Sequence, residues 1–306
     1  MGRRNVQTKH YSLGVIFALF ILIMSSIVIL TLLNDSNEET TIFEEVNYGT
    51  LETINPLVIE NSKHIVDKTD ANVNLVSEIK RVYNLDVIYG KGTEYLAETV
   101  DAKPLYDSND INKILLELVE CLEKYPNNIF KEIMLKDYSV EICLVDYFTN
   151  DNLALATRDS NNNFKVYLSH SDNREKIEKA VHHETYHILE YYMKLEYDIN
   201  DLYRDWVKYN PEGFEYQPDV AALDKNYVLN YDPLGRNYFV TIYSKVSEKE
   251  DRAEVFADTM ISGDKPTYYL DNIGAIKGKV ELLSEVLRKC FYSVEYGTYI
   301  HWTRYL

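Results

Sequence analysis

The sequence predicts an α+β fold, in which a small mixed or antiparallel sheet packs on helices. Two observations carry this prediction. Segments with strand character gather between residues 85 and 169, while helical periodicity marks the separate segments 110–125, 172–194 and 248–262. A third observation adds an N-terminal transmembrane helix, because residues 13–33 form an uncharged run long enough to span a bilayer.

The composition restricts the classes of protein to which this chain can belong. The 306 residues are 46% hydrophobic, which is ample for a packed core, and their net charge is −17. This acidic balance argues against a nucleic-acid partner, since phosphates require clustered Lys and Arg. Cys121, Cys143 and Cys290 are scattered and odd in number, so we expect buried apolar side chains rather than disulfides or a cysteine zinc site.

The uncharged run has an orientation. Arg3, Arg4 and Lys9 precede residues 13–33, and the first charge after them is Asp35. The positive-inside rule therefore places the N-terminus in the cytoplasm and the body of the chain outside. A cleaved secretory signal is the alternative, but the apolar region is long for one and no small-x-small cleavage pattern follows it. An uncleaved anchor in the cell membrane is favoured, and a cleaved signal would give a secreted protein.

These features predict four segments. After the anchor, the chain is rich in Asn, Ser, Thr and Glu and shows little apolar periodicity, as in a solvated stalk. The predicted segments are a cytoplasmic N-terminus at 1–12, the anchor at 13–33, an acidic stalk at 34–56 and a single domain at 57–306.

Strands dominate the first part of the domain. In residues 85–89, Leu85, Val87 and Tyr89 occupy alternate positions, as on one face of a strand. Residues 138–148 are rich in β-branched and aromatic side chains, and 154–169 form two strands around the turn signal at 160–163. The second strand of this hairpin, Phe164 to Ser169, leads into the next helix. It could be an edge strand that pairs with an extended peptide, or an ordinary core strand, and the sequence does not decide between them.

That next helix carries the strongest chemical signal in the chain. His183, Glu184 and His187 form an H-E-x-x-H pattern. Histidines four apart on a helix lie one above the other, so both can bind a single zinc ion, and the intervening Glu is placed to accept a proton from water. Asp172 and Glu175 suggest a capping box at the start of the helix.

His182 precedes this pair by one residue and lies about 100° around the helix, so we expect it to pack rather than bind the same ion. A catalytic zinc needs a third protein ligand. The metzincin pattern would require Gly at 190 and His at 193, where this chain has Glu190 and Met193. A distant carboxylate on a second helix is the next solution.

The helix predicted at 248–262 supplies two candidates. Glu250 and Glu254 lie one turn apart at the margin of its buried face. Between the two helices, the periodicity indicates a short helix from Ile199 to Tyr209. The Gly- and Pro-punctuated stretch from Pro211 to Tyr238 then follows, as either a lid or a structural insertion.

The segment Glu250-Asp-Arg-Ala-Glu254-Val-Phe256 begins seven residues after Tyr243 and follows the H-E-x-x-H pattern. This arrangement resembles the catalytic domain of anthrax toxin lethal factor and the related bacterial Pro-Pro endopeptidases, over roughly residues 80–300. The resemblance implies a gluzincin-like zinc metallopeptidase domain. It also implies these roles: His183, His187 and Glu250 as zinc ligands, Glu184 as general base, Tyr243 as the group that steadies the oxyanion, and Glu254 as an outer carboxylate.

Alternatives remain for two of these roles. Ser247 and Glu250 are three apart at a helix start, so Glu250 could belong to a capping box. Glu254 would then be the zinc ligand, with Asp258 as its outer partner. Tyr243 is one of 27 tyrosines and could be an ordinary structural residue.

The expected function is a membrane-anchored, extracytoplasmic metalloendopeptidase with one Zn²⁺ ion and a peptide or protein substrate. The main rival is an inactive surface protein, a binding or sensory module, that keeps a zinc-stabilised fold. A zinc hydrolase of non-peptide amides is a third possibility. Cleavage specificity and oligomeric state do not follow from the sequence.

Overall fold

The computed structural model describes residues 68–126, 128–136, 138–150, 152–160, 163–232, 234, 236–261, 274–294 and 300–303. The predicted N-terminus, anchor and stalk, at 1–12, 13–33 and 34–56, lie outside these ranges. Within them, none of the helices combines the length and the apolar character needed to cross a membrane.

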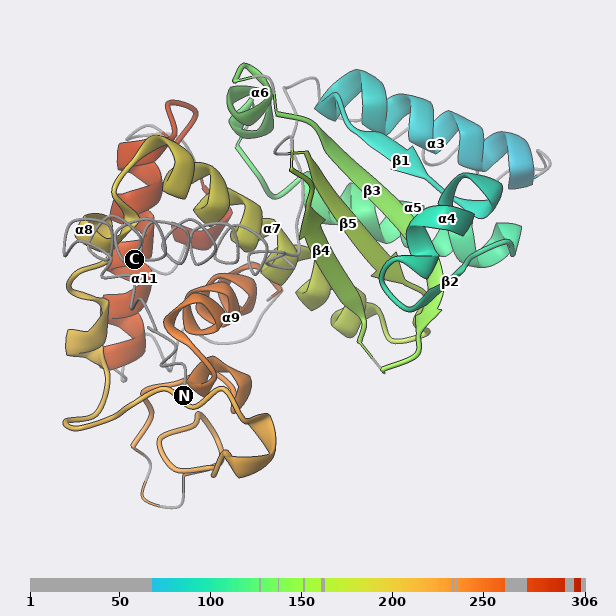
Figure 1. Cartoon of the computed structure of the whole chain (residues 1–306). Coiled ribbons are helices and arrows are strands. Elements are labelled where there is room, and N and C mark those ends of the chain that lie inside the picture. Colours follow the sequence, from blue (N-terminus) through green and yellow to red (C-terminus); the bar gives the residue numbers. More distant parts are fainter. Residues whose placement is uncertain are drawn as a thin grey trace, which may run out of the picture. The chain divides into compact units, whose positions relative to one another are not determined.

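A five-stranded mixed sheet forms one half of the described domain (Figure 1). Its strand order is β1-β3-β5-β4, and β2 also pairs with β3. The central strand β3 runs parallel to β1 and β5 and antiparallel to β2, while β4 and β5 form an antiparallel hairpin. The predicted α+β class is confirmed. The strands are β1 (Asp86–Ile88), β2 (Ala102–Pro104), β3 (Val140–Phe148), β4 (Ala154–Arg158) and β5 (Phe164–Ser169).

The order of the strands decides between the two readings of Phe164–Ser169. This strand, β5, is bonded to β3 on one side and β4 on the other, so it is a core strand. Its hairpin partner β4 lies at one end of the described strand order, and β1 lies at the other. The three-residue strand β2 was not predicted from the sequence, since it is short and its pairing with β3 shifts register between Lys103 and Pro104.

Side chains alternate across the sheet, as strand geometry requires. On β3, Ile142 and Leu144 point into the main core, and Cys143 and Val145 point into a smaller cluster on the opposite face. The helices that contribute to the main core include α3 (Lys68–Tyr83), α5 (Ser108–Leu122) and α7 (Arg174–Glu196). The smaller cluster includes residues of α4 (Glu94–Glu98), which follows the 3₁₀ turn Gly90–Thr93.

Two predictions about side chains and helices are confirmed. Cys121, Cys143 and Cys290 are buried and free of disulfides. The amphipathic helix expected from 110 to about 125 is α5, which begins after its N-cap Asp107; the Asp107 carboxylate accepts hydrogen bonds from the amides of Asn109 and Asp110.

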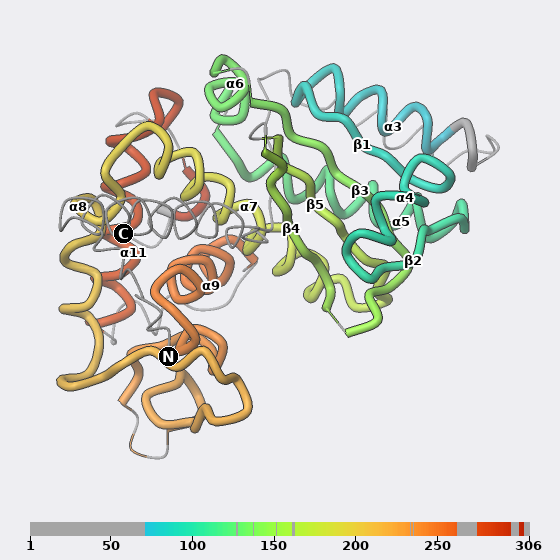
Figure 2. Tube along the Cα trace, viewed as in Figure 1, coloured from blue at the N-terminus to red at the C-terminus, as the bar shows by residue number. Residues whose placement is uncertain are grey.

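The helix α7 runs from the sheet into the helical half of the domain (Figure 2). The predicted capping box was wrong: Asn173 is the N-cap and accepts a hydrogen bond from the amide of Lys176, while Asp172 is exposed. Every residue from 181 to 193 is buried, because the middle of α7 packs between the sheet and α9 (Glu248–Met260). This packing explains why the polar residues His183, Glu184 and His187 are buried.

The helical half is assembled from short pieces and two long helices. The single helix predicted from Ile199 to Tyr209 was wrong, since the chain forms α8 (Ile199–Leu202) and a separate 3₁₀ turn, Trp206–Tyr209. A Cβ atom at Gly278 would come within 2.1 Å of the Tyr209 ring, so a glycine is needed at this contact. The remaining elements are α6 (Ile129–Met134), α11 (Gly274–Cys290) and the 3₁₀ turns Val220–Ala222, Tyr243–Lys245 and His301–Thr303.

Buried ion pairs fix α9 against its neighbours. Arg252 Nε donates to Glu190 Oε1 of α7 at 2.5 Å. Lys279 Nζ of α11 donates to Asp251 Oδ2 at 2.6 Å, and both side chains are fully buried. Trp206 also donates its indole N–H to Asp251. Because single buried charges are costly without their partners, these contacts restrict how α9 can shift or rotate relative to α7.

Candidate metal centre

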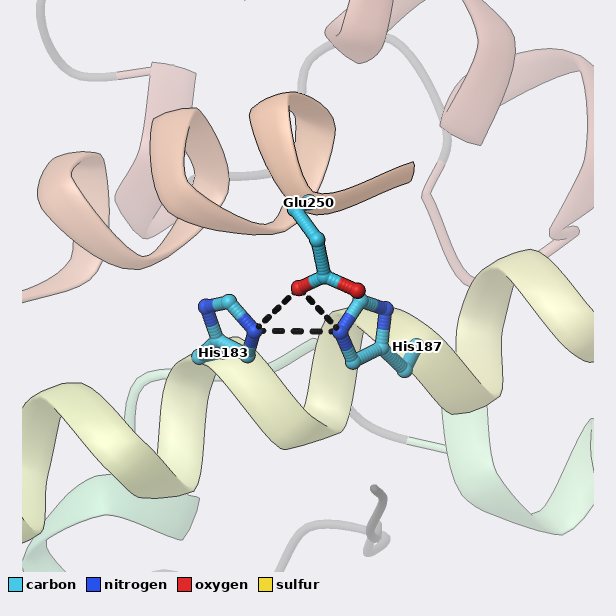
Figure 3. A group of neighbouring side chains, drawn as sticks. All are labelled: His183, His187 and Glu250. Atoms are coloured by element: carbon cyan, nitrogen blue, oxygen red, sulfur yellow. Dashed lines mark hydrogen bonds and ion pairs between the residues drawn. The ribbon is translucent and has the colours of Figure 1, made fainter. Parts of the chain in front are cut away.

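Three side chains converge where α7 and α9 cross (Figure 3). The Nε2 atoms of His183 and His187 lie 3.0 Å apart. One carboxylate oxygen of Glu250, Oε2, lies 3.1 Å from His183 Nε2 and 3.2 Å from His187 Nε2. Two helices far apart in the sequence therefore direct three potential ligand atoms at one point.

The spacing and chemistry of these atoms fit zinc. Two ligand atoms bound at about 2.0 Å in tetrahedral geometry lie roughly 3.3 Å from each other. The separations of 3.0, 3.1 and 3.2 Å are close to this value. Two imidazoles and one carboxylate are also a ligand set that catalytic zinc uses. His183, His187 and Glu250 could thus hold a metal ion.

Local sequence explains how Glu250 reaches this point. Ser247 is the N-cap of α9, and its hydroxyl accepts a hydrogen bond from the Glu250 amide at 3.2 Å. The backbone half of the predicted capping alternative is therefore present. The Glu250 carboxylate, however, is directed at His183 and His187. The cap and the contact with the histidines are compatible, because they use different atoms of the same residue.

Replacing the cap should have a modest, measurable effect. Ser247→Ala removes the acceptor for the Glu250 amide, and we expect it to lower the free energy of unfolding by about 1 kcal/mol. The measurement is the midpoint of urea unfolding, with Ser247→Asp as the matched control because aspartate also caps helices. Equal midpoints for Ser247→Ala and wild type would contradict this role.

Glu254 lies on the other side of His183. Its Oε1 atom is 2.8 Å from His183 Nδ1, the ring nitrogen that faces away from Glu250. Its Oε2 atom accepts hydrogen bonds from Lys179 Nζ at 2.5 Å and from Thr241 Oγ1 at 2.6 Å. A carboxylate on Nδ1 fixes the tautomer that leaves Nε2 available for a metal ion.

Lys179 and Thr241 were missed by reasoning from the sequence. Lys179 precedes His183 by four residues on the same helix, so its position beside that ring could have been predicted from helical spacing. Thr241 offered no such signal, because only the fold brings the segment before α9 against Glu254.

The carboxylates strongly perturb the histidines. Burial alone would lower the pKa of His183, but the neighbouring Glu184, Glu250 and Glu254 outweigh it and raise this pKa well above its ordinary value. Burial, aided by the charge of Lys249, lowers the pKa of His187 to about 3. Without a metal ion, a proton is therefore held on His183 rather than on His187.

The acidic partners respond in the opposite sense. Burial would raise the pKa of each carboxyl, but the nearby histidines hold the pKa of Glu250 well below its usual range. For Glu254, the His183 hydrogen bond and the charge of Lys179 lower the pKa to about 2. Both carboxylates are therefore ionised at neutral pH, as metal ligands and their outer partners need to be.

A pocket of about 400 Å³ opens beside His183, one of the three side chains. Glu184 and Tyr243 both line it together with His183. Tyr243 belongs to the 3₁₀ turn Tyr243–Lys245, is 42% exposed, and has its ring centroid 6.0 Å from that of His183. Leu153 and Ala154, at the start of β4, also line the pocket. A ligand in this pocket would contact both a carboxylate and a phenol next to the candidate metal centre.

His182 packs away from the group, as the helical angle predicts. It is fully buried, and its Nδ1 atom lies 2.7 Å from the hydroxyl of Tyr125. Burial lowers its pKa well below the ordinary value. His182 is therefore a neutral core residue.

No protein-family model matches the chain, and no curated protein matches it. A solved structure with a similar fold comes from Bacteroides caccae ATCC 43185 and is provisionally described as a zinc-binding metallo-peptidase. It is 18% identical, with a TM-score of 0.44, over 79% of this chain and 89% of that one. The resemblance to anthrax toxin lethal factor stays a prediction.

Proposed function

We propose that the protein is a zinc-dependent metallopeptidase that hydrolyses peptide bonds. The observation that carries this proposal is the convergence of His183, His187 and Glu250 at 3.0 to 3.2 Å, beside a pocket that Glu184 also lines. A stabilising metal site needs neither an adjacent pocket nor a further carboxylate, whereas a hydrolytic site needs both.

Glu250 is proposed as the third ligand in preference to Glu254. One Glu250 oxygen is near both Nε2 atoms, while Glu254 contacts the opposite nitrogen of His183. An ion held by both Nε2 atoms would be on the Glu250 side of the His183 ring. Glu254 would then act through His183, by accepting the hydrogen of Nδ1 and orienting the ring.

The remaining residues divide the chemistry. Zinc, when bound, is a Lewis acid that lowers the pKa of water and polarises a carbonyl. The Glu184 carboxylate accepts the proton of the attacking water and returns it to the nitrogen of the leaving amine. The Tyr243 hydroxyl donates a hydrogen bond to the negative oxygen that develops on the former carbonyl. Its position at the exposed edge of the pocket supports this role.

The substrate is proposed to bind as an extended strand along β4. This strand lies at one end of the described strand order, and the residues at its start line the pocket. An edge strand has unpaired amide and carbonyl groups that can pair with a peptide backbone. We therefore assign to β4 the pairing with an extended peptide that the sequence analysis considered for β5.

The location of the enzyme is proposed from the N-terminal sequence. Residues 13–33 would anchor the chain in the cell membrane, and residues 57–306 would lie outside the cytoplasm. The sequence of the stalk, 34–56, suits a flexible connection between the two. Protease accessibility of the domain in intact cells tests this arrangement.

The test of the function is cleavage of an unbiased peptide library by the full-length protein. We expect cleavage that stops on chelation and returns on addition of one equivalent of Zn²⁺. A protein that binds one zinc ion and cuts no peptide would match the rival, an inactive binding or sensory module. Loss of zinc binding as well would remove the basis of the proposal.

A further inference from the structure

One wall of the pocket beside the candidate metal centre is basic. Lys176, Lys179 and Ala180 line it together with His183. Residues three and four apart share one face of a helix, so these side chains form a row along the first half of α7. Lys176 precedes His183 by seven residues, which places it about 10 Å along the helix axis. Lys176 is the member of this row farthest from the metal centre.

The basic wall contrasts with the rest of the molecule. The chain carries 49 acidic residues against 32 Lys and Arg, yet its pocket has two lysines and only two carboxylates, Glu184 and Glu254. Glu254 is already engaged by Lys179 at 2.5 Å and by His183. Lys176 is exposed and forms no ion pair with any residue in the described part of the chain. The pocket therefore has an ammonium group that remains available to a ligand.

We infer that this wall recognises a carboxylate of the substrate, with Lys176 as the residue that determines specificity. The inference rests on the proposed peptidase function. An extended peptide advances about 3.3 Å per residue, so a group beside Lys176 lies about three residues from the scissile bond. The pocket is also lined by Asn152, whose side-chain amide can donate a hydrogen bond to the same carboxylate.

The carboxylate has two sources. It is either the side chain of an Asp or Glu within the peptide, or the free C-terminus of a short substrate. The first source makes the enzyme an endopeptidase selective for acidic sequences, and the second makes it a carboxypeptidase that releases short peptides. Both use the same charge contact, so the peptides in the test distinguish them.

The experiment compares cleavage of fluorogenic peptides derived from a library hit. The peptides of the first pair have an amidated C-terminus and carry either Glu or Gln three residues from the scissile bond; this pair is made once with that residue before the bond and once with it after the bond. The peptides of the second pair are neutral at that position and end there, with either a free or an amidated C-terminus. We expect kcat/KM to favour the carboxylate member of one pair by up to about fivefold, the range of an exposed ion pair. This preference should decline in 0.5 M NaCl because salt screens the contact.

Variants assign the preference to Lys176. Lys176→Gln should bring the ratio within the responsive pair close to one, and Lys176→Glu should reverse it. Lys289→Gln is the matched control, since Lys289 is an exposed helical lysine on α11 that does not line the pocket. It should retain the wild-type ratio. An unchanged ratio in both Lys176 variants, or equal cleavage within both pairs by wild type, would overturn the inference and leave the peptidase proposal standing.

A protein that cleaves no peptide of the library would instead refute the proposed function. The carboxylate inference is then measured by fluorescence anisotropy with the zinc-loaded Glu184→Gln variant and two labelled pairs of otherwise uncharged peptides, one pair with Glu or Gln in the middle and one with a free or amidated C-terminus. Recognition without turnover is supported if the carboxylate member binds more tightly than its partner and this difference disappears when Lys176→Gln is combined with Glu184→Gln. Equal or undetectable binding of both members overturns it.

Discussion

Glu184→Gln should abolish hydrolysis while the protein keeps its zinc. The amide cannot accept a proton from water, and loss of a general base costs about 100-fold to 10,000-fold in rate. Glu184 is outside the group His183, His187 and Glu250 that could hold the ion, so its replacement leaves those ligand atoms in place. The measurements are kcat/KM on a library-derived peptide and zinc content per chain by mass spectrometry.

A matched variant controls for general effects of removing a negative charge from α7. Glu175→Gln makes the same chemical change in the first turn of this helix, where the side chain is exposed and does not line the pocket. It should retain both activity and zinc. Full peptidase activity in purified Glu184→Gln protein would contradict the proposed mechanism, whatever the zinc content of that protein.

Replacing Glu250 and Glu254 of α9 one at a time should have different effects on zinc binding. We expect Glu250→Gln to weaken zinc binding by more than about 100-fold, since it removes a negatively charged ligand. Glu254→Gln should still bind one ion, with an affinity about 10-fold to 100-fold lower, the usual effect of losing an outer carboxylate. The measurement is competition for Zn²⁺ with a chelator of known affinity.

Glu248→Gln is the control for this pair. Glu248 is in the same first turn of α9, and its carboxylate contacts Arg252 at 3.2 Å rather than the histidines. Its replacement should leave zinc affinity unchanged. If Glu254→Gln lost the ion while Glu250→Gln retained it, Glu254 would be the ligand, as the capping alternative from the sequence holds.

The secondary structure near the site was largely predictable, because its signals are local. Alternation and turn residues predicted the β4–β5 hairpin, and apolar periodicity predicted α5, α7 and α9. Predictions were wrong where a local pattern has a close competitor. Asn173 rather than Asp172 caps α7, since both residue types cap well and the choice depends on where the preceding strand ends.

Other errors have a tertiary cause. The apolar residues of 199–209 suggested one helix, but α8 ends at Leu202. The next turn, Trp206–Tyr209, places Trp206 in the core, where its indole N–H donates a hydrogen bond to Asp251. Helical propensity over so short a segment is weak compared with burying a tryptophan. Likewise, strand character alone could not say that β5 is interior and β4 at the edge, because pairing partners are distant in sequence.

By itself, the sequence determined which residues could carry the chemistry. The four-residue spacing of His183 and His187 places both on one helix face wherever that helix packs, and it places Glu184 beside them. Only the tertiary structure decided how Glu250 and Glu254 of α9 are used. The crossing of α7 and α9 directs Glu250 at both Nε2 atoms and Glu254 at the Nδ1 atom of His183. Helices joined by a long connection can cross in many ways, and buried contacts such as Arg252 with Glu190 select one of them.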